Sequence, residues 1–339
     1  MQVIPAKHIG FCFGVKRAIS LAREAASQGT VYTYGALIHN GDVIARLEQE
    51  GIHAVKTLEE IPQGATAVIR SHGLSPRKRV ALESRAGRVL DATCPFVARI
   101  HEIVGEQAEA GRTILLFGAA NHPEVQGIAG YGEKSQVHIL EEIEDAQMLP
   151  PMEKACLVSQ TTAKVSDFQM VEEILQEKIK DLKVFHTICT ETRQRQEEVE
   201  TLSKKCTHIL VVGGHDSSNT QKLAAVCKKN CKHVQSIANL EEVLLENIDT
   251  NDIIGVVGGA STPNWIIMEV ITRMSELEKT MAESPELEKV EAEEAATVET
   301  SVPAEAAAAE TVEAPAAEAP AAEEAAEPSF EEAFEKTLV

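Results

Sequence analysis

Three cysteines stand at comparable intervals along the chain, and each precedes a stretch with helical character. Cys12 lies in "GFCFGVKRAI", Cys94 in "DATCPFVARI" and Cys189 in "TICTETRQRQ". Pro95 suits the first position of a helix because its φ is fixed and no amide hydrogen is needed there, which makes Cys94 the predicted N-cap residue. A thiol at a helix N-terminus feels the positive end of the helix dipole, so its pKa should fall and the metal-binding thiolate should be favoured.

Three such thiolates on separate loops could bind one metal centre. A structural zinc site usually draws ligands from close pairs such as Cys-x₂-Cys, and the sequence contains no such pair. A [4Fe–4S] cluster held by three thiolates fits better, and it leaves one iron open to a substrate. The alternative is that all three are ordinary buried cysteines. No role is assigned to the other four, which are Cys156, Cys206, Cys227 and Cys231.

Polar residues follow the remaining strand-like segments. Each histidine of one set lies between a strand-like run and a helical pattern, and two serine-rich turns offer hydroxyls and free backbone amides at helix starts, where an anion binds well. Together they predict a phosphate or diphosphate pocket, although each could instead be a local cap. The residues of this group are His39, His72, His122, Ser217, Ser218, Asn219 and Ser261.

One acidic residue is close enough in sequence to act in the same pocket. Glu124 follows His122 in "NHPEVQG", and a carboxyl group in a partly closed site can have a raised pKa and donate a proton. The alternative is a solvent-facing glutamate in the first turn of a helix. Thr161 and Thr162, in "SQTT", could donate a hydroxyl there or cap a helix. ATP and NAD are not expected, because the chain has neither a P-loop nor a complete dinucleotide fingerprint.

The strands and helices that must position these residues alternate regularly along the chain. Short β-branched runs alternate with helical patterns, which is typical of parallel α/β sheets. Nine strand-like runs are each followed by one candidate residue or loop. Along the chain these follow the order cysteine, polar loop, polar loop, and that order repeats three times. We therefore predict an α/β fold of three small modules with mostly parallel sheets, in a pseudo-threefold arrangement around a central site beyond the strand ends. The predicted modules are residues 12–94, residues 95–189, and residues 1–11 with 190–278.

Composition adds limits on class and location. The net charge is −21, but residues 281–339 hold 17 Glu against 2 Lys, so the excess lies in the tail. No basic surface for nucleic acid is expected, and no apolar run approaches the ~20 residues that span a bilayer. Seven cysteines without a visible signal peptide indicate reduced thiols and a cytoplasmic protein.

The motifs together resemble those of the 4-hydroxy-3-methylbut-2-enyl diphosphate reductase family, also called LytB. The resemblance covers roughly residues 1–275 and keeps the family's order. The segment "TETRQRQ" after Cys189 departs from it without touching a motif residue. The matching blocks are "GFCFGVKRAI", "IHN", "SHG", "DATCPFV", "NHPEVQG", "SQTT", "GGHDSSNT" and "GGASTP".

The resemblance implies an activity and roles. The activity is reductive dehydroxylation of the hydroxylated allylic diphosphate to isopentenyl and dimethylallyl diphosphate, the last step of the non-mevalonate pathway. Cys12, Cys94 and Cys189 would hold a [4Fe–4S] cluster with one iron not bound by the protein. An external one-electron donor such as a ferredoxin or flavodoxin is also implied. Glu124 would deliver protons and Thr161 would orient the substrate hydroxyl. The diphosphate would be bound by His39, His72, His122, Ser217, Ser218, Asn219 and Ser261, with His122 also counted as catalytic.

The C-terminal segment is of a different kind. Residues 280–339 are rich in Ala, Glu and Pro and are predicted to be a disordered acidic tail. The ending "PSFEEAFEKTLV" resembles the lead-in to OB-fold repeats of an RNA-binding ribosomal protein that some bacteria fuse to this reductase. Two other function classes stay open: an iron–sulfur sensor or diphosphate-binding module without turnover, and a translation-associated interaction protein.

Overall fold

The computed structural model of the chain describes residues 1–38, 40–245 and 248–298, with side chains as far as residue 281. Met1–Glu278 form one compact unit, and Lys279–Val339 are assigned to a second one. His39 and most of the predicted tail therefore lie outside the described residues. The prediction of a fusion lead-in also falls there and stays a prediction.

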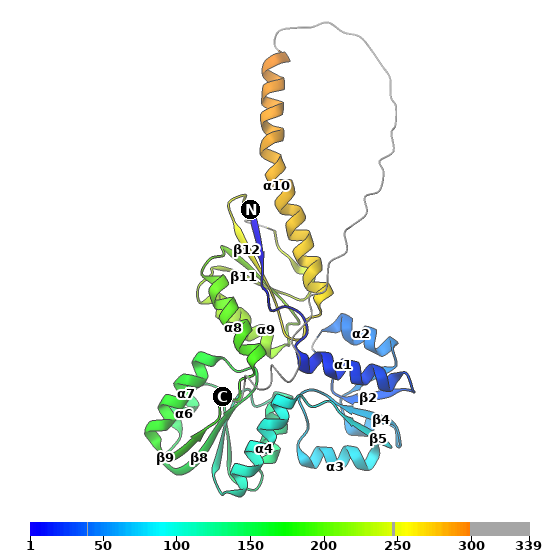
Figure 1. Cartoon of the computed structure of the whole chain (residues 1–339), viewed down its shortest axis with the longest axis vertical. Helices are drawn as coiled ribbons and strands as arrows, with labels where there is room; N and C mark the ends of the chain where they lie inside the picture. Colours follow the sequence, from blue (N-terminus) through cyan, green and yellow to red (C-terminus); the bar gives the residue numbers. More distant parts are fainter. Residues whose placement is uncertain (39, 246–247, 299–339) are drawn as a thin grey trace. The chain divides into compact units, whose positions relative to one another are not determined.

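Three four-stranded sheets form the first unit, and every strand pairing is parallel (Figure 1). The predicted α/β fold of three small modules with parallel sheets is therefore confirmed. The first sheet has the order β3 (Ile52–Val55), β2 (Val31–Tyr34), β4 (Thr66–Ile69), β5 (Arg88–Asp91). The second has the order β7 (Val137–Leu140), β6 (Thr113–Phe117), β8 (Met152–Ser159), β9 (Ile179–Val184). The third has the order β1 (Gln2–Pro5), β12 (Ile253–Gly258), β10 (His208–Val212), β11 (His233–Ile237).

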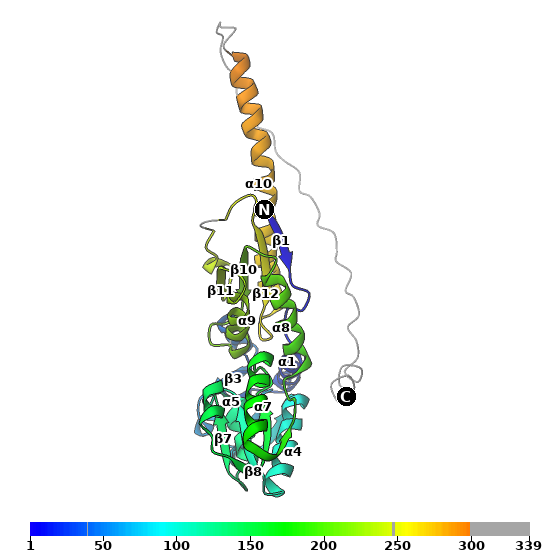
Figure 2. The ribbon, with the colours of Figure 1, turned by 90° about the vertical axis from the view of Figure 1, so that its left-hand side faces the viewer.

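Helices connect the strands and cover the sheets (Figures 1 and 2). The central strands read as continuous apolar runs, as expected where both faces of a parallel sheet are covered. In β10, for example, all of "HILVV" is buried. The helices are α1 (Phe13–Ala26), α2 (Gly41–Gln49), α3 (Pro76–Arg85), α4 (Pro95–Glu109), α5 (Pro123–Tyr131), α6 (Ile143–Met148), α7 (Val165–Lys178), α8 (Thr190–Ser203), α9 (Ser218–Lys228) and α10 (Asn264–Val298), with 3₁₀ turns at Leu58–Glu60 and Leu240–Glu242.

The strand order decides which strand ends can carry a site. Each sheet has one edge strand, β3, β7 or β11, whose C-terminal end carries no predicted site residue. The other nine strands end at the predicted motifs. The module boundaries after residues 11, 94 and 189 stay a prediction, although the strands of each sheet fall between them.

The prediction that residues 280–339 form a disordered tail stays a prediction. Helix α10 reaches residue 298, within the first part of that range. This stretch contains Ala, Glu and Lys, whose intrinsic propensity favours a helix, although it also contains Pro285, which lacks the amide hydrogen of a helix interior. In the described ranges no helix combines the length and apolar character needed to cross a membrane.

Candidate functional site

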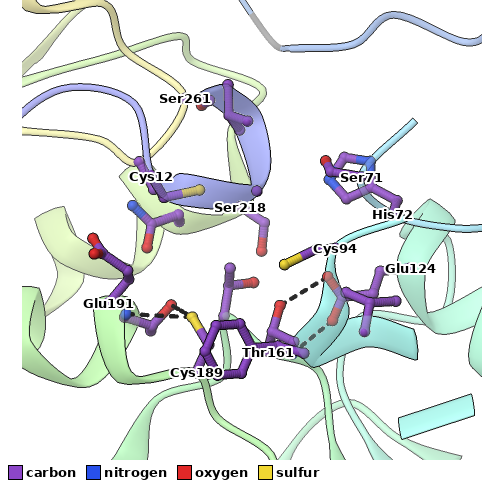
Figure 3. A pocket seen from close by; sticks show the side chains of 18 of the residues that line it. Cys12, Ser71, His72, Cys94, Glu124, Thr161, Cys189, Glu191, Ser218 and Ser261 are labelled. Carbon is purple, nitrogen blue, oxygen red and sulfur yellow. Dashed lines mark hydrogen bonds between the residues drawn. The ribbon is translucent and has the colours of Figure 1, made fainter. Parts of the chain in front are cut away.

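A pocket of ≈ 100 Å³ collects side chains from all three modules (Figure 3). Every predicted site residue that the structure describes lines it: Cys12, Cys94, Cys189, His72, His122, Glu124, Thr161, Ser217, Ser218, Asn219 and Ser261. His39 is outside the described residues, but Leu37 and Ile38 just before it line the pocket. The motifs are thus parts of one site.

The three cysteines occupy equivalent positions. Each is the N-cap residue of its helix, as predicted, with extended backbone angles. The backbone N–H of each cysteine also donates to a carbonyl in a polar loop of the site, so the same type of backbone hydrogen bond positions all three. These hydrogen bonds run from Cys12 to Ala260 at 2.9 Å, from Cys94 to Ser71 at 3.0 Å, and from Cys189 to Thr161 at 3.1 Å.

The thiols lie in a tight cradle between the modules. A Cβ atom built on Gly14, in the first turn of α1, would lie 2.9 Å from Cys94 Sγ. Only glycine therefore leaves room for that sulfur beside the helix that Cys12 caps. No group of three or more His, Cys, Asp or Glu side chains within the described ranges could hold a single metal ion. A cluster needs a wider spacing, because each thiolate binds a different iron.

This cradle gives a first testable prediction. Gly14→Ala should lower the free energy of unfolding by about 1–3 kcal/mol because the added methyl overpacks the contact with Cys94 Sγ. It should also reduce the iron bound per chain. Gly105→Ala is the control, since no atom lies within 4 Å of the added Cβ in α4; it should be neutral or stabilise by up to ~1 kcal/mol. Urea unfolding and iron analysis measure both, and equal behaviour of the two variants would contradict the cradle.

The predicted lowering of the cysteine pKa values is wrong for the protein alone. Burial raises the pKa of Cys12, and it raises the pKa values of Cys94 and Cys189 to about 12. Cys189 Sγ accepts the Thr192 N–H at 3.4 Å, but such bonds and the helix dipole do not offset the loss of hydration. Three half-buried thiolates in a site poor in water would need positive charge in the pocket. A metal cluster supplies that charge, so the donor set and its burial fit one.

Glu124 is a buried acid, not a solvent-facing one. Its residue is 2% exposed, and its carboxylate accepts the Thr161 N–H at 2.6 Å and the Thr161 hydroxyl at 2.9 Å. Burial raises the pKa of Glu124, and these two hydrogen bonds only partly oppose it. Glu124 can therefore hold a proton beside the three cysteines. Thr161 links it to Cys189, because Thr161 donates to Glu124 and its carbonyl accepts the Cys189 N–H.

The opposite wall carries the polar groups predicted to bind an anion. Ser217 caps α9, and its Oγ lies 3.1 Å from Ser261 Oγ, which joins the ends of β10 and β12. Asn219 is 6% exposed, and its Nδ2 has no hydrogen-bond partner among the described residues. The rings of His72 and His122 meet edge to face at 5.1 Å between centroids. A buried donor without a partner in a lined pocket indicates a place for a ligand acceptor.

Several residues of the site were assigned no role from the sequence, although Ser71 and Phe96 lie within quoted motifs. Glu191, Thr192, Ser71 and Phe96 also line the pocket. Lys222, one turn after Asn219 on α9, interacts electrostatically with Glu124, and burial lowers the pKa of Lys222 to about 8. Its spacing of three residues from Asn219, on one helix face, was the available signal.

The segment after Cys189 is more important than its sequence suggested. Arg195 is 3% exposed and donates to the carbonyl oxygens of His8 at 2.8 Å, Gly258 at 3.0 Å and Gly10 at 3.0 Å. It thereby ties α8, which Cys189 caps, to the loop that leads into Cys12. Gln196 accepts the Val165 N–H at 3.1 Å and donates to Ala163 O at 2.9 Å, which holds the loop after Thr161.

The other four cysteines behave as buried apolar residues. Cys206, Cys227 and Cys231 belong to one core cluster of the third module, and Cys156 lies in the buried strand β8. All are free thiols. None of these four cysteines lines the pocket, and so no observation links them to the chemistry of the site.

Comparison with known proteins agrees with this site. The sequence model of the LytB protein family matches residues 3–275. A 4-hydroxy-3-methylbut-2-enyl diphosphate reductase from Caldanaerobacter subterraneus subsp. tengcongensis is 42% identical over 283 residues, which cover 82% of this chain and 98% of the relative.

Solved structures give the same assignment. The structure of (E)-4-hydroxy-3-methyl-but-2-enyl diphosphate reductase, the terminal enzyme of the non-mevalonate pathway, is 36% identical with a TM-score of 0.60, over 81% of this chain and 100% of that one. The E-1-hydroxy-2-methyl-but-2-enyl-4-diphosphate reductase from Plasmodium falciparum is 28% identical with a TM-score of 0.74, over 80% and 87% of the two chains. The fold, the pocket and these matches together show that this chain belongs to the LytB family.

Proposed function

We propose that the chain reduces 4-hydroxy-3-methylbut-2-enyl diphosphate to isopentenyl and dimethylallyl diphosphate. One observation carries the proposal: a single pocket combines three N-cap cysteines, a buried acid and a wall of hydroxyl, amide and imidazole groups. Metal ligation, proton donation and anion binding are the three tasks that this reaction needs. The substrate gains two electrons and two protons, and its hydroxyl leaves as water.

Cys12, Cys94 and Cys189 would hold a [4Fe–4S] cluster. The fit rests on the close packing around Cys94 Sγ and on three half-buried thiols whose raised pKa values mean that their thiolate forms need positive charge nearby. When bound, the cluster would supply single electrons and an open iron that polarises the substrate hydroxyl. An external one-electron donor such as a ferredoxin or flavodoxin would reload it, in a cytoplasmic setting.

The chain's own residues would bind and orient the substrate. Ser217, Ser218, Asn219 and Ser261 offer neutral donors at the N-terminus of α9 and beside it, where a diphosphate is favoured. His72 and His122, with His39, would complete the anion site. The diphosphate held there directs the hydroxylated end of the substrate towards the cysteines and Glu124.

Glu124 and Thr161 would manage the proton. The Thr161 hydroxyl donates to Glu124 Oε2. With substrate present, a protonated Glu124 can donate to the hydroxyl oxygen of Thr161, while the Thr161 hydroxyl hydrogen turns towards the substrate oxygen. The pair thus offers a short proton path to the leaving group, and burial keeps bulk water from competing.

The direct test is anaerobic reconstitution followed by an assay with the hydroxylated diphosphate and a chemical reductant. About four irons and four sulfides per chain are expected. Cys94→Ala should lose most of both, and all turnover, because one of three ligands is gone. Cys206→Ala is the matched control, since Cys206 is a buried cysteine outside the pocket, and it should keep the metal and the activity. Stoichiometric zinc without sulfide in the wild type would overturn the proposal.

A further inference from the structure

A second pocket of ≈ 130 Å³ lies behind the loop that carries His72. Segments of the first module and the start of α5 enclose it. It shares no lining residue with the site described above. Its polar lining residues are Tyr34, Lys56, Arg70, Ser75, Lys78 and Gln126, and none of its lining residues is acidic.

Arg70 is the unusual feature of this pocket. It lies just after β4, is 9% exposed, and Nη1 donates to Ala36 O at 3.2 Å. Its Nε is buried without a hydrogen-bond partner, and no described carboxylate forms an ion pair with it. Buried arginines are almost always paired, because an uncompensated charge is costly away from water.

The backbone around Arg70 is shaped to admit this side chain. A Cβ atom on Gly35 would lie 2.6 Å from Arg70 Nη1, and Gly35 has a φ of +79°, which favours glycine. The guanidinium therefore packs closely against Gly35, where a larger residue would leave no room, and both residues line the pocket. A buried guanidinium that lines a pocket, with no carboxylate partner among the described residues, indicates a place for an anion.

The N-terminus of α3 adds to the positive electrostatic potential in this pocket. Ser75 is its N-cap residue, and its side chain makes no capping hydrogen bond. The first turn contains no acidic residue and instead carries Arg77 and Lys78. Helices usually place acidic side chains there, since the dipole is positive at that end. Lys78 also lies over the Tyr34 ring at 5.3 Å, and the exposed Lys56 completes the basic rim.

We infer that this pocket is a second anion site, which takes a phosphate or diphosphate group on Arg70, Lys56, Lys78 and the open N-terminus of α3. Its volume suits a group of that size, and a doubly charged anion would offset the buried guanidinium. The site is separate from the proposed substrate pocket and goes beyond the proposed reaction.

The second pocket is linked to the first through two short segments of the chain. Gly35 and Arg70 line the second pocket, whereas Leu37 and His72, two residues further along each segment, line the first. An anion bound to Arg70 would therefore stabilise the segments 35–37 and 70–72 on the side away from the substrate pocket. We expect it to reduce motion of the loop that carries His72.

Calorimetric titration of the reconstituted full chain with inorganic phosphate, pyrophosphate and ADP tests the inference. Asn219→Ala is included in every arm to weaken binding in the substrate pocket. In that background, saturable binding of at least one of these anions is expected. Arg70→Met should weaken it by roughly tenfold or more, because a charge-assisted hydrogen bond is lost. Preference for the inorganic anions or for ADP identifies the source of the phosphate group.

Variants of the exposed rim keep the test independent of folding. Lys56→Glu reverses a charge at the pocket without disturbing the core, and it should weaken the same binding. Lys232→Glu is the matched control on the third module, where the lysine is exposed and far from this pocket in sequence and sheet; it should bind as before. Binding that is absent with all three anions, or that persists unchanged in both Arg70→Met and Lys56→Glu, would overturn the inference.

Discussion

Replacing Glu124 by glutamine is expected to lower the rate of turnover by about 10²–10⁴-fold, the usual contribution of a positioned proton donor. Glutamine has the same shape and can still accept the Thr161 N–H, so the loop geometry should survive. Iron content and anion binding should therefore stay near the wild-type values. A rate loss without a metal or binding loss would identify Glu124 as the proton donor.

The pH dependence of the same pair of proteins sharpens this prediction. Burial raises the pKa of Glu124, so the carboxyl group keeps its proton to a higher pH than usual. Wild-type activity should fall as the pH rises through that raised pKa, and Glu124→Gln should lack this fall. The stability effect has the same sign: the contribution of Glu124 to folding is present below its unfolded pKa and is lost as the pH rises through the folded pKa.

A matched control separates charge from position. Glu144→Gln lies in the first turn of α6, in the same module, and Glu144 is exposed. It should change neither the rate nor its pH profile. Wild-type turnover in Glu124→Gln would contradict the assignment. It would favour another donor, whereas an absence of turnover in the wild type would favour the sensor or binding-module class.

Arg195→Met should lower the free energy of unfolding by roughly 3–5 kcal/mol. Three carbonyl groups, those of His8, Gly10 and Gly258, would lose their donor, and each buried group left unsatisfied costs ~1–3 kcal/mol without strict additivity. Because these bonds tie the loop before Cys12 to the helix after Cys189, two of the three proposed ligands would lose their relative placement.

The position of Arg195 predicts a signature beyond stability. The electron paramagnetic resonance spectrum of the reduced cluster should change in Arg195→Met, and iron retention during gel filtration should fall. Arg195→Lys keeps a donor and a positive charge and should restore part of both. Arg193→Met, on the exposed face of α8, is the control and should resemble the wild type. An unchanged spectrum in a destabilised Arg195→Met protein would reduce Arg195 to a purely structural residue.

The fold could be predicted because local signals repeat. Apolar β-branched runs mark the strands, and Cys94 before Pro95 marks a helix start by backbone geometry alone. Parallel strands gather their carboxyl ends at one edge, so cysteines and polar residues that follow strands must approach one another. These rules hold along the sequence, and they placed Cys12, Ser217 and Glu124 in one pocket.

Other features were decided only by the tertiary structure. Burial outweighs the helix dipole at Cys94, whose Sγ lies close against Gly14 of another helix. Arg195 and Arg70 lie in no motif, and the hydrogen-bond acceptors of both are carbonyl groups of residues distant in sequence. Desolvation and close packing depend on what surrounds a residue in three dimensions, which spacing along the chain does not encode.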